Sequence, residues 1–303
     1  MLQDHLCRGE NDRYLAETEP ELLRAGLRGG TFRLWPDDAP FTDKDKAAQP
    51  EFFDNSRRDG SLRLHDISVP AVTFRPVESK GRAPAVIVCP GGGYAYLAYE
   101  REGFAICDFL NSIGFAAFLL KYRCPDQRKA ARADDARAVR FCRYHAREFT
   151  IDPGKIGIIG FSAGGHLAAA VSAGKGEPYP ETDDIDKLPF VPDYAALVYP
   201  AYLATEDMKI SPEFDVTPNT PPTLIVQTED DSVRVENALV WYKALRDAGV
   251  KAEMHLYECG GHGYATVYRP GIPVTGWQKL AEKWFRRRVE GNDMPAFSKE
   301  AVS

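Results

Sequence analysis

The sequence predicts an α/β protein with a mostly parallel, twisted sheet and helices on both faces. From residue 85 onward, short apolar runs alternate with segments of helical spacing. Strict alternation of strand and helix is typical of parallel strands joined by right-handed crossovers. The chain has 303 residues and is 44% hydrophobic, so it can bury a sizeable core. These values exclude a disordered chain and a small disulfide scaffold.

The individual elements follow from this alternation. Strands are expected where the apolar runs occur, at residues 85–89, 115–122, 155–161, 194–199, 223–227 and 252–257. Helices are expected between them, at residues 102–112, 127–149, 163–173, 235–248 and 277–289. Gly249 lies where the fourth helix needs a left-handed cap. Before this region, residues 62–74 alternate like strands of a half-exposed sheet edge that Pro70 interrupts.

The predicted domain organisation is one main domain with two terminal segments. Residues 1–33 are expected to form an N-terminal helical arm, because Leu15, Leu22 and Leu23 recur at helical spacing before a glycine pair. Residues 34–290 form the main domain, in which 36–60 is an irregular polar span. Residues 291–303 are a C-terminal tail.

Charge and cysteine usage limit the partners. Lys and Arg number 38 against 44 Asp and Glu, which gives no footprint for nucleic acid. No apolar run approaches the roughly 18 residues that span a bilayer, so no membrane contact is expected. The chain as given is expected to be cytoplasmic, or secreted or periplasmic if a leader has been removed, and a homo-oligomer stays possible. The six cysteines are far apart, which predicts reduced structural thiols and no zinc ribbon. No His/Asp cluster has the spacing of metal ligands, so no metal is expected, and no cofactor is expected either.

Gly160, Ser162 and Gly164 form a G-x-S-x-G motif between a predicted strand and a predicted helix. Such a turn holds a serine hydroxyl above the carboxyl edge of the sheet, and its glycines avoid collisions between strand and helix. This predicts Ser162 as a nucleophile. The alternative, a phosphate-binding turn, is disfavoured because neither G-x-G-x-x-G nor a following lysine is present.

Three successive glycines follow the strand that ends at Cys89. Glycines let the backbone approach a ligand and point amide groups at a developing oxyanion. The expected donors are the amides of Gly92, Gly93 and Ala163. Alone, the glycines would equally suit a flexible turn.

The base and its acid are expected after two later strands. Among the six histidines, His262 lies in a glycine-rich loop just past a strand, where an imidazole could reach a serine. His166, inside the helix that follows the serine, is expected to be packed. Asp230 is predicted to hold the Nδ1–H of His262, with Asp231 as the alternative acid or as a helix cap.

At this point the sequence resembles the α/β-hydrolase superfamily, in particular bacterial acetylxylan and feruloyl esterases and, more distantly, the hormone-sensitive-lipase type. The resemblance covers residues 34–289 and rests on segments such as CPGGGYAYLA, IGIIGFSAGGHLAA, PPTLIVQTEDDSV and GGHGYA. It implies an α/β-hydrolase fold with Ser162 as nucleophile, Asp230 as acid, His262 as base and Gly92, Gly93 and Ala163 as oxyanion donors. Pro90 stands where hormone-sensitive-lipase relatives usually have histidine, which favours the carbohydrate-esterase side.

The expected activity is hydrolysis of short acyl esters, with acetylated carbohydrate as the preferred substrate. Tyr94, Tyr96, Tyr264 and Tyr268 flank the catalytic loops and are expected as a sugar-stacking rim, although simple loop packing is an equal alternative. The rival functions are a general carboxylesterase or serine peptidase of the same fold, and a catalytically silent binding module. No propeller-type companion domain is visible, which disfavours an oligopeptidase.

Overall fold

The computed structural model describes residues 2–5, 29–36, 38–56 and 61–290. Its centre is an eight-stranded sheet with the order β1-β4-β6-β5-β7-β8-β9-β10. β4 runs antiparallel to both of its neighbours, and all the other neighbouring strands pair in parallel. The prediction of a mostly parallel sheet is confirmed.

The bounds of the elements agree closely with the expected ones from residue 83 onward. The strands of the large sheet are β1 (Gly30–Arg33), β4 (Ala71–Arg75), β5 (Ala83–Cys89), β6 (Ala116–Lys121), β7 (Ile151–Phe161), β8 (Tyr194–Val198), β9 (Thr223–Thr228) and β10 (Ala252–Tyr257). β2 (Phe52–Asp54) and β3 (Arg63–His65) form a separate antiparallel pair. The helices are α1 (Leu2–His5), α3 (Lys44–Ala47), α4 (Ala105–Ser112), α5 (Arg128–Tyr144), α6 (Ala163–Ala173), α7 (Glu236–Asp247) and α8 (Trp277–Val289). Single helical turns lie at Glu100–Phe104, Asp184–Lys187 and Pro273–Gly276.

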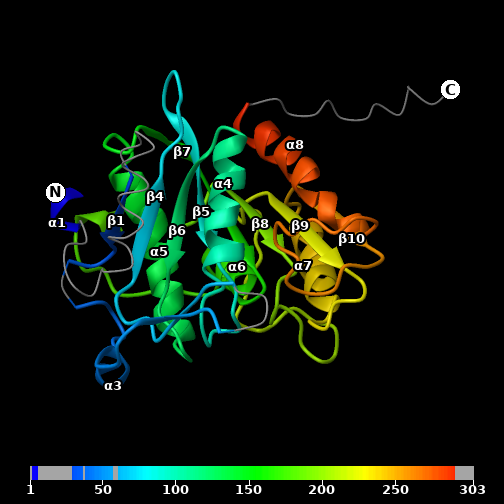
Figure 1. Ribbon diagram of the computed structural model, residues 1–303, viewed down its shortest axis with the longest axis horizontal. Helices are drawn as coiled ribbons and strands as arrows, with labels where there is room; N and C mark the ends of the chain where they lie inside the picture. Colours follow the sequence, from blue (N-terminus) through cyan, green and yellow to red (C-terminus); the bar gives the residue numbers. More distant parts are fainter. Residues whose placement is uncertain (1, 6–28, 37, 57–60, 291–303) are drawn as a thin grey trace.

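Helices cover both faces of the sheet. α5 and α6 pack side by side on one face, whereas α4 and α8 share the other, where the rings of Phe109 and Trp277 lie 6.0 Å apart. β1 lies at one end of the sheet, and β10, with α7 and α8 near it, lies at the other (Figure 1). Helices on both faces explain why the central strands are apolar throughout, since neither side of them meets water.

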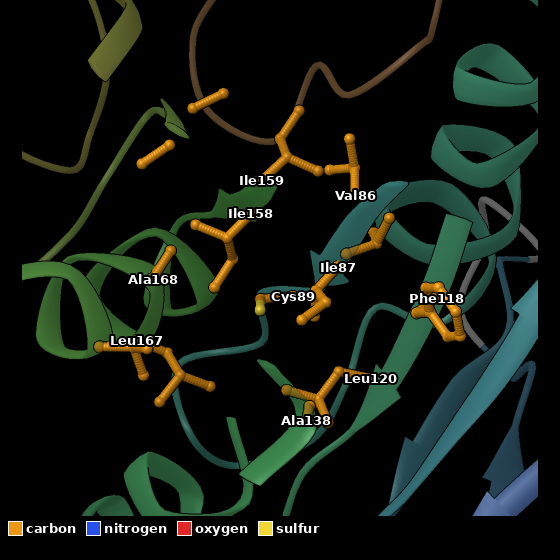
Figure 2. Close-up of a cluster of buried hydrophobic side chains, with 14 of the residues drawn as sticks. Val86, Ile87, Cys89, Phe118, Leu120, Ala138, Ile158, Ile159, Leu167 and Ala168 are labelled. Carbon is orange, nitrogen blue, oxygen red and sulfur yellow. The ribbon is translucent and has the colours of Figure 1, made fainter. Parts of the chain in front are cut away.

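The core is built from the central strands and the helices that cross them. Side chains of β5, β6 and β7 meet Ala138 of α5 and Leu167 and Ala168 of α6 (Figure 2). The small alanines let both helices approach the sheet closely. This packing fixes the carboxyl ends of the strands, where parallel sheets carry their sites.

The N-terminal region differs from expectation. Residues 6–28, on which the predicted helical arm mainly falls, lie outside the described residues, as does the predicted tail at 291–303. Gly30–Arg33, expected in the arm, form β1 and pair with β4. β4 is therefore no half-exposed edge, because β1 covers its outer side and residues 71–74 are buried.

The segment that follows β1 is held on α5. Arg137 donates to the carbonyl oxygen of Leu34 at 3.0 Å, and its guanidinium lies 4.7 Å from the ring centre of Trp35. Trp35 in turn donates to Asp134 at 3.2 Å.

Among the described residues, no helix is long and apolar enough to cross a membrane.

Candidate active site

Ser162 lies on a strained turn between β7 and α6. Its φ of 53° and ψ of −116° are unusual for a residue with a side chain. A Cβ on Gly160 would lie 2.1 Å from the carbonyl oxygen of Gly164, and one on Gly164 would lie 2.0 Å from that of Cys89. Both glycines of the motif are therefore required by close backbone contacts, as expected.

His262 lies in the loop after β10 and reaches Ser162. Its Nε2 is 2.9 Å from the Ser162 hydroxyl oxygen. The loop turns through Gly260 and Gly261, at φ 152° and 67°, and Thr228 donates to the carbonyl oxygen of Gly261 at 2.9 Å. The ring of Tyr199 packs edge-on against the imidazole at 4.8 Å. The expected meeting of Ser162 and His262 is present.

The carboxylate beside His262 belongs to Asp231, which corrects the expectation for Asp230. Asp231 lies 2.9 Å from Nδ1 of His262, and its side chain is fully buried. Asp230 points the other way and accepts from the amides of Gly260 and Gly261 at 3.1 and 2.8 Å. These two amides, that of Gly261 first, lower the pKa of Asp230. The carboxylate of Asp230 thus stabilises the loop that carries His262. The backbone turn after β9 directs the next side chain, that of Asp231, toward His262.

The glycine loop lies beside the nucleophile. Gly92 and Gly93 line a cleft of about 770 Å³ together with Ser162 and His262, and Ala163 follows Ser162 at the start of α6. Within the described part of the chain, the amide protons of Gly92, Gly93 and Ala163 meet no protein acceptor. These amides are therefore available to an oxyanion.

A buried carboxyl group holds the base of this loop. Glu102 accepts from the amide of Gly91 at 2.7 Å and from the hydroxyl of Tyr199 at 2.9 Å. Burial raises the pKa of Glu102, and the hydrogen bonds from Tyr199 and Gly91 oppose that rise. Glu102 is a residue that sequence reasoning missed, because it lies inside an ordinary helical segment.

The tyrosines predicted to form a sugar-stacking rim are not all placed at the cleft. Tyr96 lines the cleft. Tyr94 and Tyr264 do not, because they are 2% and 1% exposed and pack inside the protein. Tyr94 donates or accepts at Nδ1 of His166, and Tyr264 packs against Tyr199 at 4.6 Å. Tyr268 is 73% exposed and is also not among the cleft residues.

Other cleft residues have no motif of their own. Tyr202 follows β8 and lines the cleft, a position that the end of the predicted strand could have indicated. Four arginines also line it, and they come from segments far apart in the chain: Arg63, Arg101, Arg234 and Arg269. No local pattern could have gathered them.

The arrangement can activate a serine hydroxyl. His262 can take the proton of Ser162 through Nε2 while Asp231 holds Nδ1–H and stabilises the imidazolium that forms. Amides beside the hydroxyl can stabilise negative charge on a carbonyl oxygen. A hydroxyl, an imidazole, a carboxylate and free amides at one strand edge suit acyl transfer.

Comparison with known proteins agrees with the acyl-transfer chemistry that the site indicates. The BD-FAE family matches residues 73–186, and the prolyl oligopeptidase family matches residues 181–290. An acetylxylan esterase of Xylanibacter ruminicola is 32% identical over 220 residues, which is 64% of this chain and 43% of that protein. Endo-1,4-beta-xylanase B of Butyrivibrio fibrisolvens is 30% identical over 203 residues, 59% of this chain and 32% of that protein. The chain thus spans less than half the length of these two relatives.

A solved structure extends the likeness over most of the chain. The acetyl ester-xyloside bifunctional hydrolase of Caldicellulosiruptor lactoaceticus has a TM-score of 0.70 and 32% identity, and the match covers 86% of this chain and 96% of that one. A likeness of this extent at this identity goes beyond a shared arrangement of strands and helices.

Proposed function

Since the chain belongs to the α/β-hydrolase superfamily, in its esterase group, we propose that it is a serine carboxylic ester hydrolase that acts on short acyl esters of carbohydrates. The observation that carries the proposal is the chain of contacts from Ser162 through His262 to Asp231, with both distances at 2.9 Å. An acyl-enzyme mechanism needs these three groups in this order.

The reaction proceeds in two halves. Ser162 attacks the ester carbonyl carbon while His262 takes the hydroxyl proton, and the amides of Gly92, Gly93 and Ala163 hold the resulting oxyanion. The alcohol leaves with the proton from His262, which leaves an acyl group on Ser162. Water then attacks that acyl group, His262 accepts the proton of the water, and the carboxylic acid is released as Ser162 regains its proton.

Acetylated carbohydrate is the preferred substrate class. Relatives named for acetylxylan and acetyl ester-xyloside hydrolysis support it, as does a cleft that Tyr96 and Tyr202 flank with aromatic rings. An interfacial lipase is disfavoured, because the insertion at 177–193 is acidic and proline-containing rather than apolar. In a chain-length series, acetate esters should therefore be cleaved faster than decanoate esters.

The experiment compares acetate release from acetylated xylan with hydrolysis of 4-nitrophenyl acetate. Wild-type protein should release acetate and should be labelled by a fluorophosphonate probe, whereas Ser162→Ala should lose both activity and labelling. Wild-type turnover by Ser162→Ala would overturn the mechanism. Activity on aryl esters without acetate release from the polysaccharide would overturn only the proposed substrate class and leave the mechanism standing.

The match of residues 181–290 to the prolyl oligopeptidase family supports a second candidate, a serine peptidase. Paired amide and ester substrates with the same acyl group separate the two functions. A kcat/KM for the amide that equals or exceeds that for the ester would favour the peptidase.

A homo-oligomer stays a prediction, which light scattering on the purified protein would test.

A further inference from the structure

His166 is buried behind Ser162 and holds partners on both sides. It lies on the first turn of α6 and is 2% exposed. Its Nδ1 is 2.7 Å from the hydroxyl of Tyr94, and its Nε2 is 3.1 Å from a carboxylate oxygen of Glu213. Because a carboxylate only accepts, Nε2 carries the proton and Nδ1 accepts from Tyr94 in the neutral ring.

The two partners of His166 come from different segments beside the cleft. Tyr94 directly follows Gly93 in the glycine loop and has a φ of 61°, a conformation that costs a residue with a side chain about 1 kcal/mol or more. Glu213 belongs to the segment after β8, which also carries Tyr202. A Cβ on Gly93 would lie 4.0 Å from the Tyr202 hydroxyl, so this segment faces the glycine loop.

Ring contacts reinforce the same connection. The ring of Tyr202 lies 5.8 Å from that of His166 and 6.3 Å from that of Tyr94. The guanidinium of Arg128 lies over the rings of Tyr202 and Tyr94, at 4.2 and 5.0 Å. The imidazole of His166 on α6 therefore connects the glycine loop with the segment after β8 that carries Tyr202 and Glu213.

We propose that the chain Tyr94–His166–Glu213 is a positioning network that sets the place of the Gly92 and Gly93 amides relative to the Ser162 hydroxyl. None of its three members lines the cleft, so its effect reaches substrate only through the loop. The network should therefore affect how well the amides stabilise the oxyanion, which forms only during the reaction. Binding of the substrate before the reaction should be unchanged. The inference rests on the proposed function.

The test is Tyr94→Phe, which removes one hydroxyl and keeps the ring. We expect kcat for 4-nitrophenyl acetate to fall about 10-fold with KM unchanged, because displaced amides lose part of the roughly 10²- to 10³-fold effect of an oxyanion donor. Affinity for a boronic acid transition-state analogue should fall by a similar factor. Glu213→Gln keeps an acceptor for Nε2–H and should stay near wild type, whereas Glu213→Ala should follow Tyr94→Phe.

Tyr194→Phe is the matched control. It also removes a buried tyrosine hydroxyl, which donates to the carbonyl oxygen of Ala85 at 3.0 Å near the amino ends of β8 and β5. Tyr194→Phe should lower the midpoint temperature of thermal unfolding and leave kcat unchanged. An active wild type whose kcat and analogue affinity survive Tyr94→Phe would overturn the network alone. An inactive wild type would overturn the proposed function instead.

Discussion

A carboxylate oxygen of Asp231 lies 2.9 Å from Nδ1 of His262, and the amide of Val233 donates to Oδ1 of the same carboxylate at 2.7 Å. The amide fixes the carboxylate, and the carboxylate fixes the imidazole. Because the carboxylate only accepts, Nδ1 carries a proton and Nε2 faces Ser162 as the acceptor. Asp231 therefore selects the tautomer that can take the serine proton.

Asp231→Asn should lower kcat for 4-nitrophenyl acetate by about 10⁴-fold, because an amide at this position favours the wrong tautomer of His262. Asp230→Asn should cost much less than Asp231→Asn, since it weakens only the hydrogen bonds to the amides of Gly260 and Gly261. Steady-state kinetics on both variants, with circular dichroism to confirm folding, measure the difference. A larger loss for Asp230→Asn would return the role of acid to that residue.

Gly92→Ala should impair the oxyanion amides. The φ of Gly92 is +133°, and a Cβ there would lie 2.0 Å from the carbonyl oxygen of Tyr96, so the loop has to move. We expect kcat to fall about 10²- to 10³-fold, as when an oxyanion donor is lost. Gly81→Ala is the control, because a Cβ on Gly81 meets no atom within 4 Å. Equal activity of the two variants would contradict the role of this loop.

The sequence could predict those parts of the site that depend on local backbone chemistry. Ser162 needs flanking glycines at close contacts, and His262 follows a strand in a glycine-rich loop, so both leave a visible pattern. The bounds of α6 and β10 agree with the expected ones because helical and strand periodicities are local.

Neighbouring residues of the same kind could not be separated in this way. Asp230 and Asp231 both follow β9, and which carboxylate turns inward depends on the turn and on the amides it meets. Tyr94 and Tyr96 differ for a similar reason: the left-handed backbone at Tyr94 directs its ring to His166, whereas Tyr96 lines the cleft. β1 was missed because its four residues pair only with β4, a contact that no local pattern encodes.

Arg137→Ala should destabilise the fold strongly. The Arg137 guanidinium is fully buried and pairs with Asp183 at 2.6 Å and with Asp186 at 2.7 Å. Removing it leaves the buried carboxylate of Asp186 with Arg140, 3.9 Å away, as its remaining cation, and breaking a buried ion pair typically costs about 3–5 kcal/mol. Urea unfolding measures this loss, and limited proteolysis should show earlier cleavage near Leu34, whose carbonyl oxygen loses its donor.

Arg137→Met separates charge from packing. It keeps an apolar contact with Trp35 but still removes the nearer cation of Asp186, so it should recover little of the lost free energy of unfolding. Adding Asp186→Asn to Arg137→Met should recover more, because the buried, poorly compensated charge is then gone. If the double variant were no more stable than Arg137→Met, the ion pair would not be the source of the effect.

Asp135→Asn should remove part of the pH dependence of stability. Asp135 is buried on α5, where Cys89 donates to its Oδ1 at 3.6 Å and its Oδ2 has no partner. Burial raises the pKa of Asp135 well above its usual value, with the hydrogen bond from Cys89 opposing the rise. The folded state therefore keeps a proton that the unfolded state has lost once the pH exceeds the ordinary aspartate range, near 4.

The sign of the effect follows from this proton. Above the unfolded pKa, each unit of rising pH favours the unfolded state by up to about 1.4 kcal/mol from this group, until the folded pKa is reached. Asparagine has no such proton, so the free energy of unfolding of Asp135→Asn relative to wild type should rise between pH 5 and pH 8. Urea titrations of both proteins across this range measure it. A constant difference would mean that Asp135 is already ionised in the folded protein, and that the unpartnered oxygen beside Cys89 is stabilised by a donor such as a buried water.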